Sequence, residues 1–492
     1  MIEGKFKKDF LKGSAAATIG TVSSMFFHFF SIMLLTRNIG KSDLGIYVLL
    51  LAMVNFFNIL SSWGLNITLV KFISSVDKKQ NKAALRAILN LRVVLLVILT
   101  VLFYFFSDLI LPLFSLKKET FVFWIPLLFI TASYKDLFFN VLQGLNEYKK
   151  YSIVQVISAA FRVVVIILFL YLNNLTLANL IYIEVFTSLV SVGVQLMIVP
   201  FRKLIDYKPT KETYKDIVKF STPIHFNNIL TFAYDRVSIL FLGALLNPLS
   251  VAMYDIANKI PEALQRMFVS FMIVYFPNSS KLFSAGSKKD ALYLMNKSIN
   301  FFSVSIAILT FIAFTFSQTI VVLLFSSAYI KTAPAFAILM LNFYLRIMSN
   351  IKGYTIVSAG NSSVSVKVNI VSSIVNIGLA YVLIPKYGFM GAVYSVLVMN
   401  TIAQIIYHLY LIKLDLHTDG LNYLRPMFLL FIFAIVPFYL GVDSLIIKLV
   451  LSAAFLVCNW YFVEEFRNII HKVSKQVKSL SSKIKYKIST AN

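Results

Sequence analysis

The stretch SAAATIGTVSSMFFHFFSIMLLT, residues 14–36, is apolar along its whole length apart from small hydroxyl side chains and one histidine, His28. The hydrocarbon core of a bilayer is about 30 Å thick and needs about 20 apolar residues in an α-helix to span it. Irregular backbone cannot face lipid. The stretch therefore predicts a membrane-spanning helix. Because many similar runs follow it, we interpret it as a first span rather than a cleaved signal peptide.

The composition of the chain agrees with this interpretation. Of its 492 residues, 59% are hydrophobic and 14% are charged, whereas about 25% are charged in a soluble domain. A net charge of +25 could suggest nucleic acid, but the Lys and Arg residues lie in short clusters between apolar runs, so no nucleic-acid partner is expected. The lone Cys458 allows no internal disulfide, and the sequence offers no cysteine–histidine metal site.

About fourteen apolar runs are long enough to span a bilayer as helices, which predicts an all-α integral membrane protein. The expected helices cover residues 14–36, 45–68, 87–110, 121–142, 151–172, 176–199, 218–245, 249–275, 297–324, 333–356, 364–384, 389–412, 426–441 and 444–463. Lys and Arg accumulate in alternate loops and in both terminal segments. Cytoplasmic loops carry this excess, so we expect both termini in the cytoplasm, which requires an even number of spans.

The chain resembles two copies of one unit. An offset of 207 residues places Tyr47 on Tyr254, and six expected helices separate equivalent points. Two such copies have the same orientation, and transporters built in this way bind their substrate between the copies. We expect an N-lobe of helices 1–6, a C-lobe of helices 7–12, an accessory pair of helices 13–14 and a basic cytoplasmic tail, over residues 1–205, 206–415, 416–465 and 466–492.

Four charged residues lie on one face of the expected helix 249–275. Asp255, Lys259, Glu262 and Arg266 fall within an arc of about 60° and form two acid-first i,i+4 pairs. They would either line a water-filled cavity, or neutralise each other so that the helix can insert or latch the two lobes together. Pro261, in the middle of the same helix, predicts a kink or gate.

Ionisable residues at membrane depth are candidate functional residues, because each costs several kcal/mol unless it is paired or faces water. Glu184 shares one face of the helix 176–199 with Ser188, Ser191 and Gln195. Arg162, in the preceding expected helix, lies about as deep. We therefore expect Arg162 and Glu184 to pair across adjacent helices.

Arg346 lies near the middle of its expected helix, on a stripe with Asn342 and Asn350 and with no acidic residue in the same helix. A guanidinium keeps its charge and binds anions through two parallel hydrogen bonds. Arg346 is therefore the best candidate for holding an anion. The alternative is a carboxylate partner elsewhere in the lobe.

The pair of His28 and Asp235, and separately Lys135, each have two interpretations. Asp235 is adjacent to Arg236, so their side chains point about 100° apart, and the 207-residue offset places His28 on Asp235. This suggests a proton-coupling pair, although a histidine on a Phe-rich helix is also a common packing residue. Lys135, beside Asp136, either extends toward the membrane surface or faces a cavity.

Four segments carry a resemblance to a known family. LIPKYGFMGAVYS, residues 383–395, is similar to the elbow between helices 11 and 12 of the polysaccharide-export flippases, the Wzx-type proteins that move O-antigen and capsule units. SVAMYDIANKIPEAL and FPNSSKLF, residues 250–264 and 276–283, resemble the helix 7–8 corner and helix 8 exit of this family. Residues 12–72 look like its opening hairpin.

The resemblance implies the fold of the multidrug/oligosaccharidyl-lipid/polysaccharide superfamily, which is MATE-like, with two six-helix lobes and an accessory pair. It implies a bacterial cytoplasmic (inner) membrane protein that flips an undecaprenyl-pyrophosphate-linked oligosaccharide repeat unit to the outer leaflet by alternating access. The product would be O-antigen, capsule or exopolysaccharide, made with a polysaccharide polymerase and chain-length machinery. No cofactor is expected beyond H⁺ or Na⁺ coupling.

Under this hypothesis the charged residues divide into two groups. The candidates for binding the pyrophosphate or lining the cavity are Arg346, Arg236, Lys259, Arg266, Arg162 and Lys135. The candidates for coupling or gating are His28, Asp235, Asp255, Glu262, Glu184 and Pro261. The acids of the helix 249–275 depart from the positive cavity that the flippase hypothesis needs, which leaves the roles of Lys259 and Arg266 open.

Two other functions remain as alternatives. A multidrug-extrusion antiporter would exchange H⁺ or Na⁺ for cationic drugs, but the excess of cations at depth and the additional helices 13–14 are unfavourable to it. A membrane polymerase or glycosyltransferase would carry catalytic residues in a long external loop. The expected external loops are short, so we expect no enzyme.

Overall fold

The computed structural model describes residues 2–73, 78–199, 207–416, 424–471 and 474 of the chain. All regular secondary structure in these residues is helical, and the predicted all-α membrane fold class is confirmed. Most of the predicted basic tail and the predicted lobe boundary at residues 205 and 206 lie outside the described residues.

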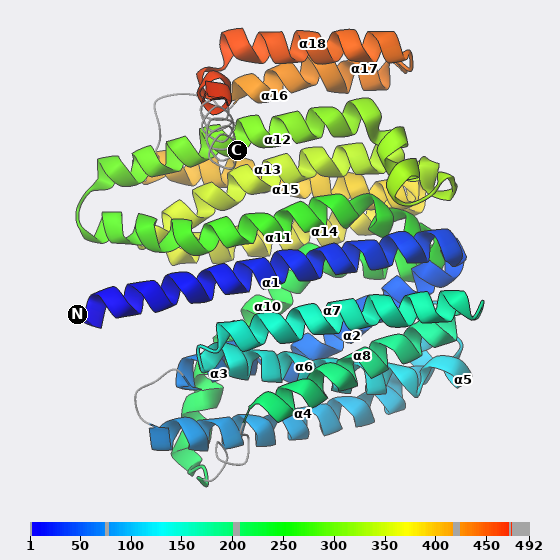
Figure 1. Cartoon of the computed structure of the whole chain (residues 1–492), viewed down its shortest axis with the longest axis vertical. Coiled ribbons are helices and arrows are strands. Elements are labelled where there is room, and N and C mark those ends of the chain that lie inside the picture. Colours follow the sequence, from blue (N-terminus) through cyan, green and yellow to red (C-terminus); the bar gives the residue numbers. More distant parts are fainter. Residues whose placement is uncertain (1, 74–77, 200–206, 417–423, 472–473, 475–492) are drawn as a thin grey trace, which may run out of the picture. The chain divides into compact units, whose positions relative to one another are not determined.

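The first half of the chain contributes eight labelled helices (Figure 1). They are α1 (Ile2–Asn38), α2 (Lys41–Ser62), α3 (Leu65–Ile73), α4 (Lys78–Leu113), α5 (Lys118–Phe121), α6 (Trp124–Gly144), α7 (Tyr148–Tyr171) and α8 (Leu177–Ile198).

The second half contributes the remaining elements of the described chain. They are α10 (Lys211–Leu245), α11 (Pro248–Ser284), α12 (Lys288–Leu324), η1 (Ser327–Thr332), α13 (Ala333–Ser358), α14 (Ser362–Tyr387), α15 (Phe389–Lys413), α16 (Leu424–Leu430), η2 (Phe431–Ile435), α17 (Val436–Tyr439) and α18 (Leu445–Phe462).

Each of the fourteen predicted runs coincides with helix. Twelve helices of the described chain are long and apolar enough to cross a membrane. The other two runs are α11, which carries four charged side chains in its first half, and the short segment 424–439, which contains the π-helical turn η2. The number of spans is therefore close to fourteen.

The exposed side chains of α4 show that this helix is surrounded by lipid on one side. One face of the helix buries Leu96 and Phe103, while the other exposes Val94, Val97, Val101 and Phe105. Because an exposed face without polar groups suits hydrocarbon and not water, α4 is a lipid-facing helix. Phe57 of α2 lies between Phe103 and Phe129 of α6, with ring centroids 5.5 and 5.4 Å away, and joins the three helices in an aromatic core.

The predicted helix 45–68 is divided into α2 and α3. Trp63 and Gly64 have left-handed backbone conformations, with φ of 43° and 71°. Trp63 stacks on His225 of α10, with ring centroids 4.2 Å apart, and its Nε1 donates to Thr222 Oγ1 at 3.3 Å. A side chain at position 64 would collide with the α10 backbone at Ser221. The bend therefore exists because α10 packs closely against it.

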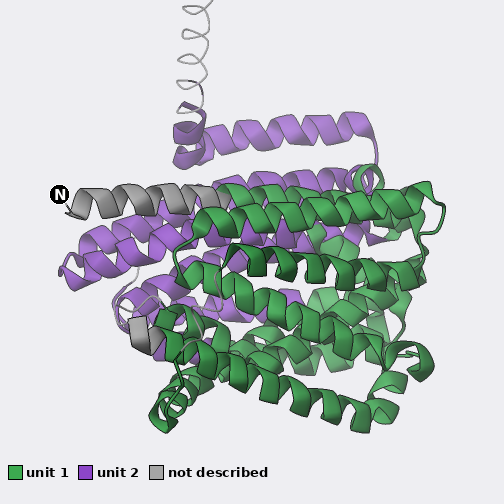
Figure 2. Cartoon of the chain, turned by 60° about the horizontal axis from the view of Figure 1, so that its bottom comes forward, with its two compact units in different colours: residues 1–259, 322–331, 369–395 green, residues 260–321, 332–368, 396–492 purple. Residues whose placement is uncertain are grey.

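The described chain forms two compact units (Figure 2). Unit 1 comprises residues 1–259, 322–331 and 369–395, and unit 2 comprises residues 260–321, 332–368 and 396–492. Unit 1 thus contains α10 and the start of α11, and both pack closely against α2. A side chain at Gly45 of α2 would meet the backbone of Pro248, and one at Gly243 of α10 would lie 2.7 Å from Leu49 of α2.

The predicted duplication concerns repeated helices rather than compact units, and it stays a prediction. One pairing inside unit 1 agrees with it. In the first copy α1 packs along α7. In the second copy, Ser373 and Asn376 of α14 donate to the carbonyls of Leu230 and Tyr234 in α10 at 3.3 and 3.5 Å. These are the helices that the offset makes equivalent.

We expect Gly64→Ala to lower the free energy of unfolding, because left-handed backbone strain in a residue other than glycine costs about 1–3 kcal/mol and the new methyl group meets α10. Gly193→Ala in α8 is the matched control: no atom lies within 4 Å of its Cβ position, so this change should stabilise the helix by about 1 kcal/mol or less. Melting curves in detergent measure both. Equal melting temperatures would contradict the close packing of α10.

Candidate functional site: a polar cavity lined by α1, α3, α6, α7 and α8

Polar residues recur along α7 at helical spacing. Tyr151, Gln155, Ser158 and Arg162 are separated by four, three and four residues, so they form one stripe along the helix. Asp136, Asn140 and Gln143 form a second stripe on α6, and Lys135 lies beside it. Because α6, α7 and α8 pack against one another inside unit 1, the two stripes can face a common space.

That space is a cavity of about 400 Å³. Fifteen residues line it: His28 of α1, Asn66 of α3, Lys135, Asp136, Phe139, Asn140 and Gln143 of α6, Tyr151, Gln155, Ser158, Ala159 and Arg162 of α7, and Glu184, Thr187 and Ser188 of α8. The predicted candidates His28, Lys135, Arg162 and Glu184 are thus brought together. Lys135 faces this cavity, which favours the cavity interpretation over extension to the membrane surface.

An ion pair at one side of the cavity joins α7 and α8. Arg162 Nε lies 2.8 Å from Glu184 Oε1, so the expected pair across adjacent helices is present. Arg162 is only 7% exposed. Breaking a buried pair by removing one partner costs about 3–5 kcal/mol, because the other charge stays buried. Each of these two residues therefore requires the other.

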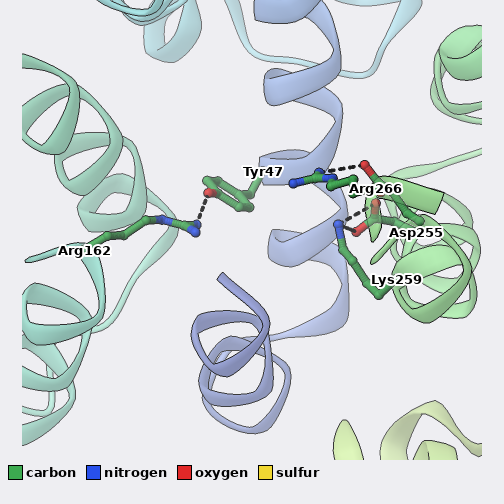
Figure 3. Close-up of polar contacts among 6 residues, drawn as sticks. Tyr47, Arg162, Asp255, Lys259 and Arg266 are labelled. Atoms are coloured by element: carbon green, nitrogen blue, oxygen red, sulfur yellow. Dashed lines mark hydrogen bonds and ion pairs between the residues drawn. The ribbon is translucent and has the colours of Figure 1, made fainter. Parts of the chain in front are cut away.

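The Tyr47 hydroxyl of α2 bridges the two members of this ion pair. Arg162 Nη2 donates to the Tyr47 hydroxyl at 2.6 Å (Figure 3). This hydroxyl donates in turn to Glu184 Oε1 at 2.5 Å. Arg162 Nη1 lies 3.3 Å from His28 Nδ1. One guanidinium thus connects four helices, α1, α2, α7 and α8.

The second carboxylate of the cavity is also engaged. Asp136 Oδ2 accepts a hydrogen bond of 2.6 Å from Asn58 Nδ2 of α2. With Lys135 next to it and the Arg162–Glu184 pair opposite, the cavity contains cations and anions in nearly equal number. Amides and hydroxyls supply the rest of its polar groups. Its chemistry is that of a hydrogen-bonding cavity, with little net charge.

Arg92 was not among the residues predicted from the sequence. This residue of α4 is fully buried, and its Nη2 donates to Asn66 Oδ1 of α3, in the cavity wall. The predicted helix 87–110 placed Arg92 near a membrane surface, where a cation is unremarkable. Because α4 begins at Lys78, Arg92 lies well inside the helix. The signal that could have found it is the apolar run LRVVLLVIL, which continues past it on its far side.

Both predicted i,i+4 pairs form on α11. Lys259 Nζ lies 2.8 Å from Asp255 Oδ2, and Arg266 Nη2 lies 2.9 Å from Glu262 Oε1 (Figure 3). Asp255 is buried, whereas the Arg266 side chain is 53% exposed. The helix continues through Pro261, and the division between the units falls just after Lys259. The predicted kink and gate stay predictions.

The remaining candidates do not line this cavity. On α10, Asp235 is exposed and Arg236 is half-buried. Arg346 is half-buried on α13 in unit 2, and Asn342 of the same stripe accepts a hydrogen bond of 2.7 Å from Asn400 Nδ2 of α15. The anion-binding and coupling roles of these residues stay predictions.

The polar cavity lies inside unit 1 of a chain of membrane helices, and solved structures share the fold of this chain. A structure of the lipid II flippase MurJ in an inward closed conformation has a TM-score of 0.70 at 16% identity, over 92% of this chain and 99% of that one. An inward-facing multidrug resistance MATE family transporter of the MOP superfamily has a TM-score of 0.67 at 16% identity, over 80% and 94%.

Sequence comparison gives the family. Residues 10–283 match the polysaccharide biosynthesis protein family, and the chain belongs to this family. An uncharacterised membrane protein of Methanocaldococcus jannaschii is 30% identical over 120 residues, which is 24% of this chain and 24% of that protein's length. The two solved structures are those of a flippase and of a multidrug transporter, and at 16% identity they show the fold of this chain.

We expect Tyr47→Phe to lower the free energy of unfolding by about 1–3 kcal/mol, because it leaves buried groups of Arg162 and Glu184 without the hydroxyl that joins them. Glu184→Gln should cost more, about 3–5 kcal/mol, because it leaves the guanidinium without a counter-charge. Tyr171→Phe, at the exposed end of α7, is the control. Melting of the three purified variants ranks them, and a Tyr47→Phe protein as stable as the control would refute the role of the hydroxyl.

Proposed function

We propose that this chain flips an oligosaccharide repeat unit linked to undecaprenyl pyrophosphate from the cytoplasmic to the outer leaflet of a bacterial cytoplasmic membrane. The flipped unit would enter O-antigen, capsule or exopolysaccharide synthesis, with a polymerase and its chain-length machinery consuming it on the outer side. Membership of the polysaccharide biosynthesis family and the fold shared with a lipid II flippase support the proposal. The basic loops and termini support a cytoplasmic position for both ends.

The observation that carries the proposal is the amide-rich wall of the cavity. A sugar presents hydroxyls that donate and accept hydrogen bonds, and side-chain amides do both as well. Four amides line the cavity: Asn66, Asn140, Gln143 and Gln155. The rings of Phe139 and Tyr151 add apolar faces beside them. Together these groups provide the mixture of polar contacts and flat apolar surface that a glycan requires.

The multidrug antiporter is the second candidate, because a MATE transporter shares the fold. A lipophilic cationic drug needs apolar cavity walls and a carboxylate that is not already paired. In this cavity Glu184 is paired with Arg162, and Asp136 accepts a hydrogen bond from Asn58. The polar wall and these engaged carboxylates favour the glycan over a cationic drug.

A transport assay separates the two functions. Proteoliposomes that contain the full chain should move a labelled undecaprenyl-pyrophosphate oligosaccharide to the opposite leaflet and should leave a monovalent cationic dye untransported. Gln155→Ala should slow movement of the glycan lipid, because it removes an amide from the wall. Dye transport with no movement of the glycan lipid would overturn the proposal in favour of the antiporter.

For the pyrophosphate we propose Arg346, whose guanidinium can donate two parallel hydrogen bonds to phosphate oxygens. Its half-buried position on α13, on a stripe with Asn342 and Asn350, supports this role. Arg346→Ala should abolish delivery of polysaccharide to the cell surface in a strain whose only copy is the variant, while the protein still inserts. Lys386→Ala, at the exposed end of α14, is the control. Normal surface polysaccharide in the Arg346→Ala strain would exclude this role.

We propose H⁺ coupling through His28, whose ring faces Arg162 of α7 at 3.3 Å in a cavity that also contains Glu184, Lys135 and Asp136. Histidine is the side chain that ordinarily titrates between about pH 5 and 8. His28→Gln should therefore flatten the pH dependence of flipping in this range, whereas His471→Gln, on an exposed position, should preserve it. An unchanged pH profile in His28→Gln would reject this coupling route and leave Na⁺ as the ion to test.

A further inference from the structure

Unit 2 contains a separate polar cavity of about 300 Å³. Its walls come from the first half of α12, from Arg425 at the start of α16 and from the residues that follow α18. Residues 464–471 are helical and follow α18 after one extended residue, Val463. None of the proposed transport residues lines this cavity.

The cavity gathers two cations and two anions that do not pair with one another. The cations are Lys297 and Arg425, and the anions are Glu464 and Glu465. Lys297 Nζ donates to the Tyr293 hydroxyl at 3.2 Å, and Arg425 Nη1 donates to the Phe462 carbonyl at 3.4 Å. In the part of the chain that the structure describes, no ion pair involves any of these four charges.

The cavity lies where apolar spans end. α12 begins at Lys288 and α18 ends at Phe462, so the cavity walls come from the ends of two spanning helices. Tyr293 and Phe462 in the wall are 64% and 62% exposed, and aromatic side chains concentrate at the level of lipid headgroups. α18 exposes apolar residues along its length, including Ile446, Val450 and Val457. Acyl chains can cover that surface while a headgroup enters the cavity.

We infer that this cavity binds the headgroup of a phospholipid that carries both a phosphate and a primary ammonium group, as phosphatidylethanolamine does. Lys297 and Arg425 supply charged donors for the phosphate. Glu464 and Glu465 supply acceptors for the N–H groups of the ammonium. Asn296, Asn300 and Asn468, which also line the cavity, offer amide donors for the ester oxygens. The four charges then find their partners in one zwitterionic ligand.

This assignment excludes two common headgroups by chemistry. A phosphatidylglycerol headgroup has the phosphate but no cation for the two glutamates, and it would bring a net negative charge beside them. A phosphatidylcholine headgroup has a cation, but its quaternary nitrogen has no N–H to donate. Basic pockets between helices at the cytoplasmic surface usually select anionic lipids, so selection of a zwitterion depends on Glu464 and Glu465.

Native mass spectrometry of the full chain in detergent tests the inference with phosphatidylethanolamine, phosphatidylglycerol and phosphatidylcholine of the same acyl chains. Phosphatidylethanolamine should be retained in preference to both. The double variant Glu464→Gln/Glu465→Gln should lower this preference by about a hundredfold, since each of the two charged hydrogen bonds contributes roughly a factor of ten. Lys297→Gln/Arg425→Gln should weaken retention of phosphatidylethanolamine and phosphatidylglycerol alike.

The control variant is Asp443→Asn/Lys448→Gln, which removes a surface ion pair before and within α18 and should leave the lipid preference unchanged. Melting of each variant in lipid-free detergent verifies its fold. Soluble glycerophosphoethanolamine should compete with the lipid better than inorganic phosphate does. Equal competition by phosphate alone, or equal retention of phosphatidylethanolamine and phosphatidylglycerol, would overturn the inference. The outcome is independent of the flipping assays, because no transport residue is altered.

Discussion

The guanidinium of Arg162 cannot give up its charge, and it lies inside a bundle of helices whose surroundings are hydrocarbon. Water is therefore not available to solvate it from outside the protein, and the chain itself must do so. Glu184 supplies the opposite charge, and Tyr47 fills the remaining hydrogen-bonding positions between the two. Since these partners come from α8 and α2, with His28 beside them on α1, one charge fixes the relative rotation of four helices.

The same requirement explains why the charges in the spans occur largely as pairs. On α11 each acid has its base four residues later, so the helix neutralises itself. In the cavity, neutralisation instead takes place between helices and leaves amides and hydroxyls facing the open space. A ligand that carries many hydroxyls can form hydrogen bonds with these groups without displacing an ion pair. The polar groups that face the open space are thus those that remain after the charges have satisfied one another.

Much of this could be predicted from the sequence, for identifiable reasons. Apolar runs specify helices in lipid because the backbone has no alternative there, and the acid–base spacing on α11 fixes its pairs locally. The Arg162–Glu184 pair could be expected because the two residues lie at similar depth on consecutive helices. Tyr47 could not be assigned to the pair, since tyrosine is common in spans and only tertiary packing brings α2 to the site. The bend at Trp63 and Gly64 was also missed, because its cause is α10, a helix more than 140 residues further along the chain.

One helix belongs to both units. α11 runs without interruption from Pro248 to Ser284, yet its first twelve residues belong to unit 1 and the remainder to unit 2. Because the helix does not stop at the boundary, no loop joins its two parts. Pro261 has no N–H for the carbonyl four residues before it. Two residues past the boundary, the helix therefore continues with one backbone hydrogen bond fewer.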